Sequence, residues 1–158
     1  TNYLSDAKGF TGRKGEIFLD LESTVPEDLL HRFDVVFNHT TLEHIYEFRV
    51  AFRNLCLLSR DVVIVVVPYL QQMHGVNYGD YWRFTPQALS SLFEENRYKM
   101  RYCSANGADR ASIYLYAMGF SDDRWNDSIP FRCDRELNDK VPLYGPGCRN
   151  VIGGRVIE

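Results

Sequence analysis

Residues 61–68, Asp-Val-Val-Ile-Val-Val-Val-Pro, decide the fold of this chain. Between Asp61 and Pro68 stand six consecutive β-branched apolar residues, the kind of side chain that is enriched in strands. Such a run is apolar on both faces, which is typical of a central strand in a parallel sheet. It therefore predicts an α/β protein with this strand near the middle of its sheet.

The segments before this strand predict three further elements. Residues 16–21 and 34–38 are short apolar runs of strand length. Between residues 42 and 58, apolar side chains recur at steps of three and four, which predicts an amphipathic helix. The side chains on its apolar face are Leu42, Ile45, Phe48, Phe52, Leu55 and Leu58.

The segments after it predict a helix and a hairpin. Thr85 and Pro86 suit the N-cap and first position of a helix, which we expect over residues 85–96. Residues 98–103 and 111–118 have strand patterns and flank an Asn-Gly turn signal, so they predict an antiparallel hairpin. No helical or strand periodicity follows. We expect a mostly parallel α/β domain over residues 1–119 and an irregular C-terminal extension over residues 120–158.

Composition excludes several classes of protein. The chain has 158 residues, of which 18 are Lys or Arg and 21 are Asp or Glu, so its formal charge is −3. This near-neutral, evenly spread charge predicts no nucleic-acid partner, and the absence of an apolar stretch of about 18 residues predicts no membrane span. The four cysteines form no Cys-x-x-Cys pair. Their spacing favours reduced thiols and a cytoplasmic location over a disulfide scaffold or a zinc module.

Polar residues at the ends of the predicted strands are candidates for a ligand site. Parallel α/β sheets bind ligands beyond the carboxyl ends of their strands. The segments at such ends are 20–22, 38–41 and the loop after Pro68. Asp and Asn also make turns and cap helices at these places in ordinary sheets, so both roles stay open. In the loop after Pro68, His74 is the best candidate for a catalytic base, and a solvent-exposed loop histidine is the alternative.

Two motifs resemble a known family. Residues 33–45, Phe-Asp-Val-Val-Phe-Asn-His-Thr-Thr-Leu-Glu-His-Ile, resemble the fourth-strand signature of class I S-adenosylmethionine-dependent methyltransferases, F-D-x-V followed by H-x-x-L-E-H. Residues 80–86, Asp-Tyr-Trp-Arg-Phe-Thr-Pro, resemble a segment after the fifth strand in the type 11 branch of that family. The resemblance covers residues 15–119 and implies an incomplete Rossmann-like sheet that closes with the antiparallel hairpin.

The resemblance also implies a site. S-adenosylmethionine would be the cofactor, and a small molecule would be the methyl acceptor. The residues that would bind the cofactor are Asp20, Leu21, Asn38, His39 and Thr40. The residues that would line the acceptor entrance are Tyr81, Trp82 and Arg83. Trp82 and Arg83 also have a structural alternative to acceptor contact, with equal weight. Trp82 could pack just before the helix, and Arg83 could cap the end of the sheet.

One element of the family is not found. The family has an acidic residue and a G-x-G loop after its first strand, whereas the glycine-rich segment 9–15 of this chain follows no apolar strand. We therefore expect a domain truncated on its N-terminal side. Three hypotheses stay open: a partial methyltransferase, a degenerate non-catalytic module that binds a partner or forms a homodimer covering its exposed sheet, and a complete enzyme with its front removed.

A metal site is not expected from the histidines. His39, Glu43 and His44 have the spacing H-x-x-x-E-H, one residue longer than the zinc signature H-x-x-E-H. On a helix, five residues of separation would place the two imidazoles on different faces. Glu43 and His44 are therefore expected to be structural polar residues.

Overall fold

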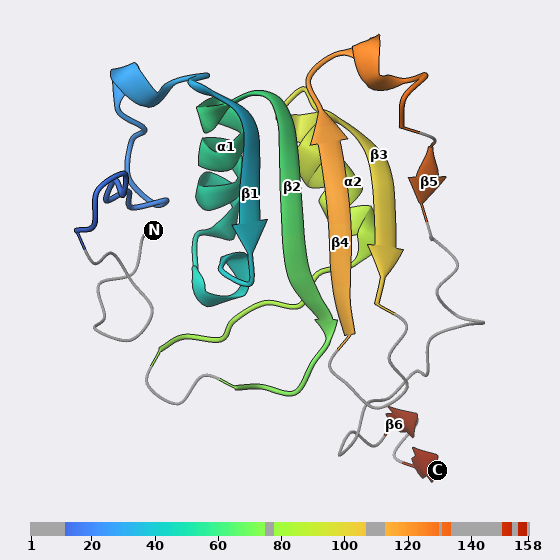
Figure 1. Ribbon diagram of the computed structural model, residues 1–158. Coiled ribbons are helices and arrows are strands. Elements are labelled where there is room, and N and C mark those ends of the chain that lie inside the picture. Colours follow the sequence, from blue (N-terminus) through green and yellow to red (C-terminus); the bar gives the residue numbers. More distant parts are fainter. Residues whose placement is uncertain are drawn as a thin grey trace.

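A mixed sheet forms the centre of the computed structural model (Figure 1). The structure describes residues 12–74, 78–106, 113–129, 131–133, 150–152 and 155–157. The strands are β1 (Phe33–His39), β2 (Ser59–Leu70), β3 (Lys99–Ala105), β4 (Ile113–Phe120) and β5 (Arg132–Cys133), in the spatial order β1-β2-β4-β3-β5. β1 runs parallel to β2, β4 runs antiparallel to β2 and β3, and β5 runs parallel to β3. The predicted α/β fold and the hairpin of β3 and β4 are confirmed.

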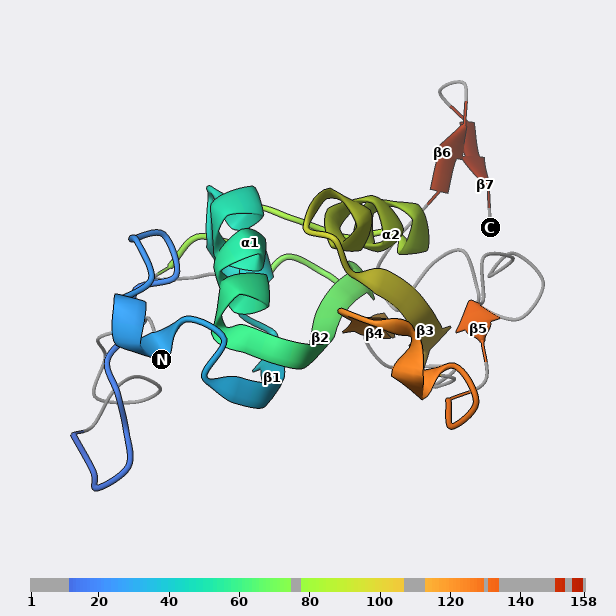
Figure 2. The same ribbon diagram turned by 90° about the horizontal axis from the view of Figure 1, so that it is seen from above.

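Two α-helices cover one face of this sheet. α1 (Phe48–Leu58) and α2 (Pro86–Glu95) lie on the same side of the strands when the molecule is seen from above (Figure 2). Short 3-10 helices precede β1 (η1, Glu27–Leu29), precede α1 (η2, Leu42–His44) and follow β4 (η3, Asp123–Trp125). A separate pair of strands, β6 (Asn150–Ile152) and β7 (Arg155–Ile157), is antiparallel.

The core lies between the sheet and these two helices. Alternate residues of β2, namely Val63, Val65 and Val67, are completely buried on the helix side. Ile64 and Val66, which alternate with them, are half-buried on the opposite face of the sheet. Two phenylalanines, Phe52 of α1 and Phe93 of α2, meet edge to face at 5.0 Å. Within the described residues, helices therefore cover one face of the central strand, although its sequence is apolar on both.

The other face of the sheet is open at β1. Val35 and Phe37 point away from the helices and are 53% and 59% exposed. β1 is also the edge strand, because β2 is its sole partner in the described sheet. An apolar edge strand with one free side is a surface that proteins normally cover.

Two predicted elements differ from the structure. Residues 16–21 form no strand, since no neighbouring strand pairs with them, and Ile17 and Phe18 are about half exposed. The helix predicted over 42–58 begins at Phe48, after a 3-10 turn. Its first residues do not join the helix because the Glu43 carbonyl accepts the backbone N–H of Tyr81 at 2.8 Å. The Trp82 indole N–H also donates to the carbonyls of Ile45 and Tyr46.

The segment after β4 contacts the sheet. The Trp125 indole N–H donates to Asp61 at 2.9 Å, and β5 pairs with β3 at Tyr102 and Cys103. These contacts fall in the first part of the predicted C-terminal extension, most of whose remaining residues lie outside the described ones. None of the helices in the described part of the chain has the length and apolar character that a bilayer-spanning helix needs.

Candidate functional site

The loops after the two parallel strands meet at the carboxyl edge of the sheet. The loop after β1 contains η2, and the loop after β2 runs to α2 through the motif of residues 80–86. Backbone hydrogen bonds from Tyr81 and Trp82 to the Glu43 carbonyl join the loops, at 2.8 and 3.3 Å. The two sequence motifs, about 40 residues apart in the chain, therefore form one local structure.

An ion pair holds the second loop together. Arg83 donates to both carboxylate oxygens of Asp80, at 2.7 and 2.8 Å, and the side chain of Asp80 is 2% exposed. The guanidinium of Arg83 holds the pKa of Asp80 well below its usual range. Arg83 also donates to the carbonyl of Gln71 at 2.9 Å. For Arg83, these contacts favour a structural role over contact with a methyl acceptor, because its guanidinium N–H groups donate to residues of its own loop.

Glu43 is buried in the contact between the loops. Its side chain is completely inaccessible to solvent, and neither carboxylate oxygen accepts a hydrogen bond from another residue. Burial raises the pKa of Glu43 from 4.5 to about 7; its own backbone N–H opposes the rise, the nearby carboxylate of Asp80 adds to it, and Arg83 opposes it. A buried polar group without a partner is rare and calls for a physical explanation.

Two histidines stand beside Glu43. His44 Nε2 lies 3.8 Å from Glu43 Oε1, and the rings of His44 and His74 are 4.9 Å apart, edge to face. Burial is the main cause of the lowered pKa of His44. His74 Nδ1 lies 3.3 Å from Asp80 Oδ2, and the His74 backbone N–H donates to the same oxygen at 2.9 Å.

This group was not predicted from the sequence. Glu43, His44 and His74 each offer one ligand atom, and the three atoms lie within 4.8 Å of one another. His39, which the spacing had associated with Glu43 and His44, is not a member of the group. The sequence signal that could have found it is Glu43 itself, a charged residue between the apolar Leu42 and the apolar Ile45.

Trp82 and Tyr81, two aromatic residues of the second motif, lie in different surroundings. Trp82 packs against Phe48 with ring centroids 4.8 Å apart, and its indole is hydrogen-bonded, so it forms part of the wall between the loops. Tyr81 is 52% exposed and stacks edge to face on Tyr46 at 5.4 Å. Of the three predicted acceptor-binding residues, Tyr81 is therefore the one that presents an open surface.

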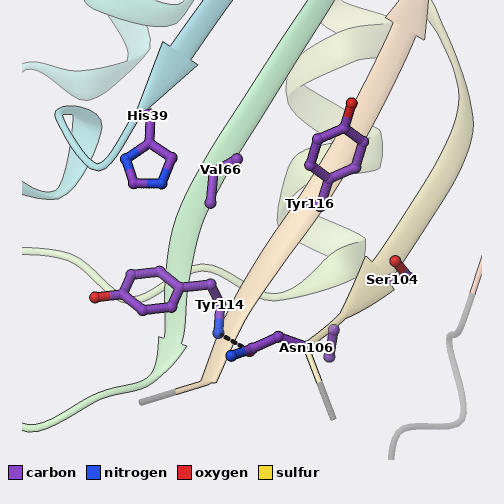
Figure 3. Close-up of a pocket in the computed structure, with 7 residues that line it drawn as sticks. His39, Val66, Ser104, Asn106, Tyr114 and Tyr116 are labelled. Atoms are coloured by element: carbon purple, nitrogen blue, oxygen red, sulfur yellow. Dashed lines mark hydrogen bonds between the residues drawn. The ribbon is translucent and has the colours of Figure 1, made fainter. Parts of the chain in front are cut away.

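The end of β1 carries the predicted cofactor residues 38–40. Asn38 is buried on the helix side with its Oδ1 unpartnered. His39 lies on the open face, in a surface pocket of about 330 Å³ that Val66, Tyr114 and Tyr116 also line (Figure 3). Thr40 has a φ of +47°, a left-handed backbone conformation that is unusual for a β-branched residue.

The other two predicted cofactor residues, Asp20 and Leu21, lie away from this end of β1. Asp20 does not end a strand. Its carboxylate accepts from the Glu22 backbone N–H at 2.9 Å and from the Ser23 hydroxyl at 2.8 Å, and so stabilises a turn. Leu21 belongs to the core, and its carbonyl accepts from Asn54 of α1 at 2.8 Å.

Comparison with known proteins bears on the fold. A methyltransferase from Methanosarcina mazei superimposes with a TM-score of 0.50 at 10% identity, covering 66% of this chain and 65% of that one. The CMeT domain of citrinin polyketide synthase also has a TM-score of 0.50, at 9% identity, covering 67% of this chain and 32% of that one. The chain has a methyltransferase-type α/β fold.

A third similar structure illustrates the difference in length. The 1,6-didemethyltoxoflavin-N1-methyltransferase of Burkholderia thailandensis has 16% identity and a TM-score of 0.49, with 65% of this chain and 49% of that chain covered. This chain thus spans about half the length of that methyltransferase. No family model and no curated protein matches the sequence.

Proposed function

We propose that this chain is the C-terminal part of a type 11-like, S-adenosylmethionine-dependent methyltransferase domain. The observation that carries the proposal is the junction of the two motifs, in which Tyr81 and Trp82 bond the backbone of Glu43 at the carboxyl edge of the sheet. Ligand sites of α/β sheets lie at this edge. The structural likeness to methyltransferases supports the fold that the proposal requires.

The residues at the end of β1 fit a cofactor better than those near Asp20. Asn38 has an unpartnered buried oxygen that could accept a hydrogen bond, and Thr40 holds a constrained backbone beside it. Both oxygens of Asp20 are already used in its own turn. S-adenosylmethionine would supply an activated methyl group on a sulfonium, and Asn38, His39 and Thr40 would position it.

The acceptor in this proposal is a small molecule that approaches Tyr81. Methyl transfer is a displacement that depends mainly on the orientation of its reactants and the exclusion of water. The exposed ring of Tyr81 offers a flat apolar contact for an acceptor, and His74, 32% exposed, could take the proton that the acceptor loses. The cytoplasmic location and the absence of a nucleic-acid partner remain predictions from the sequence.

Titration calorimetry with S-adenosylmethionine and S-adenosylhomocysteine tests the proposal. We expect both to bind with a dissociation constant below about 1 mM, equivalent to about −4 kcal/mol. Asn38→Ala should weaken binding about tenfold, the loss of one hydrogen bond to a charged ligand. Asn126→Ala, a change of the same kind on the exposed turn after η3, is the matched control. Binding no tighter than millimolar, or equal effects of the two substitutions, would contradict the proposal.

A second candidate function is a non-catalytic module that self-associates. The exposed Val35 and Phe37 on the edge strand β1 favour it, because a second copy could cover this face. Sedimentation velocity should then show a dimer that Phe37→Lys dissociates, while Phe131→Lys, at an exposed phenylalanine outside β1, leaves it intact. A wild-type protein that stays monomeric at every concentration would refute this candidate.

A further inference from the structure

Three metal-binding side chains converge between the two loops. Glu43 and His44 come from η2, and His74 comes from the loop after β2. One ligand atom from each lies within 4.8 Å of the other two. Tetrahedral zinc ligands at 2.0–2.2 Å from the ion are about 3.4 Å apart, so side-chain shifts of about 1 Å would close the site.

The first argument for a cation is the state of Glu43. Both of its carboxylate oxygens are buried without a hydrogen-bond donor, in a side chain with no solvent exposure. Buried carboxylates are paired with charges or coordinate metals, because an unpaired one is very costly. Arg83, the nearby cation, directs its hydrogen bonds to Asp80 and to carbonyl oxygens of its own loop. A metal ion would give the Glu43 oxygens the partner that they lack.

The second argument is the orientation of His44. Its Nδ1 lies 2.6 Å from the carbonyl oxygen of Gly79. Because a carbonyl can only accept, Nδ1 must carry the proton, and in the neutral ring Nε2 then presents a lone pair. That Nε2 is the nitrogen 3.8 Å from Glu43 Oε1. Metal-binding histidines typically donate their other ring N–H to a carbonyl or a carboxylate.

The third argument is the support behind His74. Its Nδ1 is buried without a hydrogen bond and stands 3.3 Å from Asp80 Oδ2, and Asp80 is fixed by the bidentate bond from Arg83. Besides a backbone carbonyl, a carboxylate is the common acceptor for the second ring N–H of a metal-bound histidine. His74 is also partly exposed, at 32% of its side chain, so an ion can reach the group from solvent.

We propose that Glu43, His44 and His74 bind a zinc-type divalent metal ion, with a fourth coordination position open to water or substrate. Two imidazoles and one carboxylate suit Zn²⁺ better than Mg²⁺ or Ca²⁺, which take oxygen ligands. Three protein ligands with one open position are typical of catalytic zinc sites, whereas structural sites have four protein ligands. The site differs from the one that the sequence spacing excluded, because His74 takes the place of His39. A metal-bound His74 cannot also take a proton from a methyl acceptor, so the two roles of His74 are alternatives.

Zinc binding by the full chain, prepared without a histidine tag and dialysed against a chelator, tests the proposal. We expect one Zn²⁺ per chain, with a dissociation constant of about 1 μM or tighter. His74→Ala should weaken binding at least about tenfold, since removing only a group that hydrogen-bonds to a metal ligand already costs about 10–100-fold. His31→Asn is the matched control, because it removes an imidazole outside the group and Asn tolerates the φ of +50° at that position.

Two further measurements separate coordination from unspecific binding. Co²⁺ alone should give the intense visible absorption of a tetrahedral complex, and His74→Ala should abolish it. Zn²⁺ should raise the Tm of the wild type and of His31→Asn but not that of His74→Ala. Equal Zn²⁺ affinity in wild type and His74→Ala, or no binding near micromolar, would overturn the proposal. These titrations contain no S-adenosylmethionine, so their outcome is independent of the proposed methyltransferase function.

Discussion

Replacing Glu43 by Gln should remove the loss of stability that the metal-free protein undergoes as the pH rises from 4.5 to about 7. Burial raises the pKa of Glu43 from 4.5 to about 7, with Asp80 adding to the rise and Arg83 opposing it. Each pKa unit corresponds to about 1.4 kcal/mol, so ionising Glu43 in the folded chain costs about 3 kcal/mol relative to the unfolded chain. The neutral amide of Gln avoids this cost.

The sign of the pH dependence follows from the proton balance. Between pH 4.5 and about 7 the unfolded chain releases the Glu43 proton while the folded chain retains it. As the pH rises through this range, the free energy of unfolding of the wild type therefore falls relative to that of Glu43→Gln. Above about pH 7 the difference between the two proteins is constant. The other titratable groups near Glu43 are His44, His74, Asp80 and Arg83, and all four are present in both proteins.

Urea denaturation in a chelating buffer at pH 4.5, 6 and 8 measures the effect. The difference in unfolding free energy between Glu43→Gln and wild type should shift by about 3 kcal/mol in favour of the variant from the lowest to the highest pH. Any constant cost of burying the amide cancels in this comparison. Glu27→Gln, at an exposed position, should show no such shift. A difference between Glu43→Gln and wild type that does not change with pH would refute the reasoning.

Three further substitutions test the packing around the site by thermal or urea denaturation. Thr85→Ala removes the oxygen that accepts the Ala88 N–H at 3.1 Å and should cost about 1 kcal/mol, whereas Thr85→Ser should cost much less. Trp82→Phe leaves the carbonyls of Ile45 and Tyr46 without their indole donor and should lower the free energy of unfolding by about 1 kcal/mol. An unchanged Tm would contradict a structural role for Trp82 between the two loops. Gly119→Ala places a Cβ against the Phe93 ring and should cost about 1–3 kcal/mol; no loss would show that the ring can move aside.

Local signals in the sequence were sufficient for much of the fold. The β-branched run at residues 61–68 lies inside β2, and Thr85 and Pro86 begin α2 with the predicted cap. The hairpin of β3 and β4 also agrees with its alternating pattern. In each case the interactions that determine the helix or strand lie within one segment or between neighbouring segments. Composition and periodicity are therefore sufficient to predict the element.

The failures involve partners that are distant in the sequence. Residues 42–47 have helical spacing, but the carbonyls of Glu43, Ile45 and Tyr46 accept from Tyr81 or Trp82 instead of from helix amides. Residues 16–21 have strand character, but no strand in the described part of the chain pairs with them. The group of Glu43, His44 and His74 was missed for the same reason, because His74 is 30 residues after His44 in the sequence and only the folded loops bring it beside the other two.

The position of β4 has a consequence for how the sheet assembles. β4 follows β3 in the chain but lies between β2 and β3, with Val63 opposite Gly119 and Met100 opposite the same glycine. During synthesis β2 therefore has one open edge until residue 120 has left the ribosome. Contacts of such long sequence separation slow folding and lengthen the time during which an apolar strand can join another chain. Ribosome-bound chains ending before residue 113 should accordingly depend on chaperones more than chains that include β4.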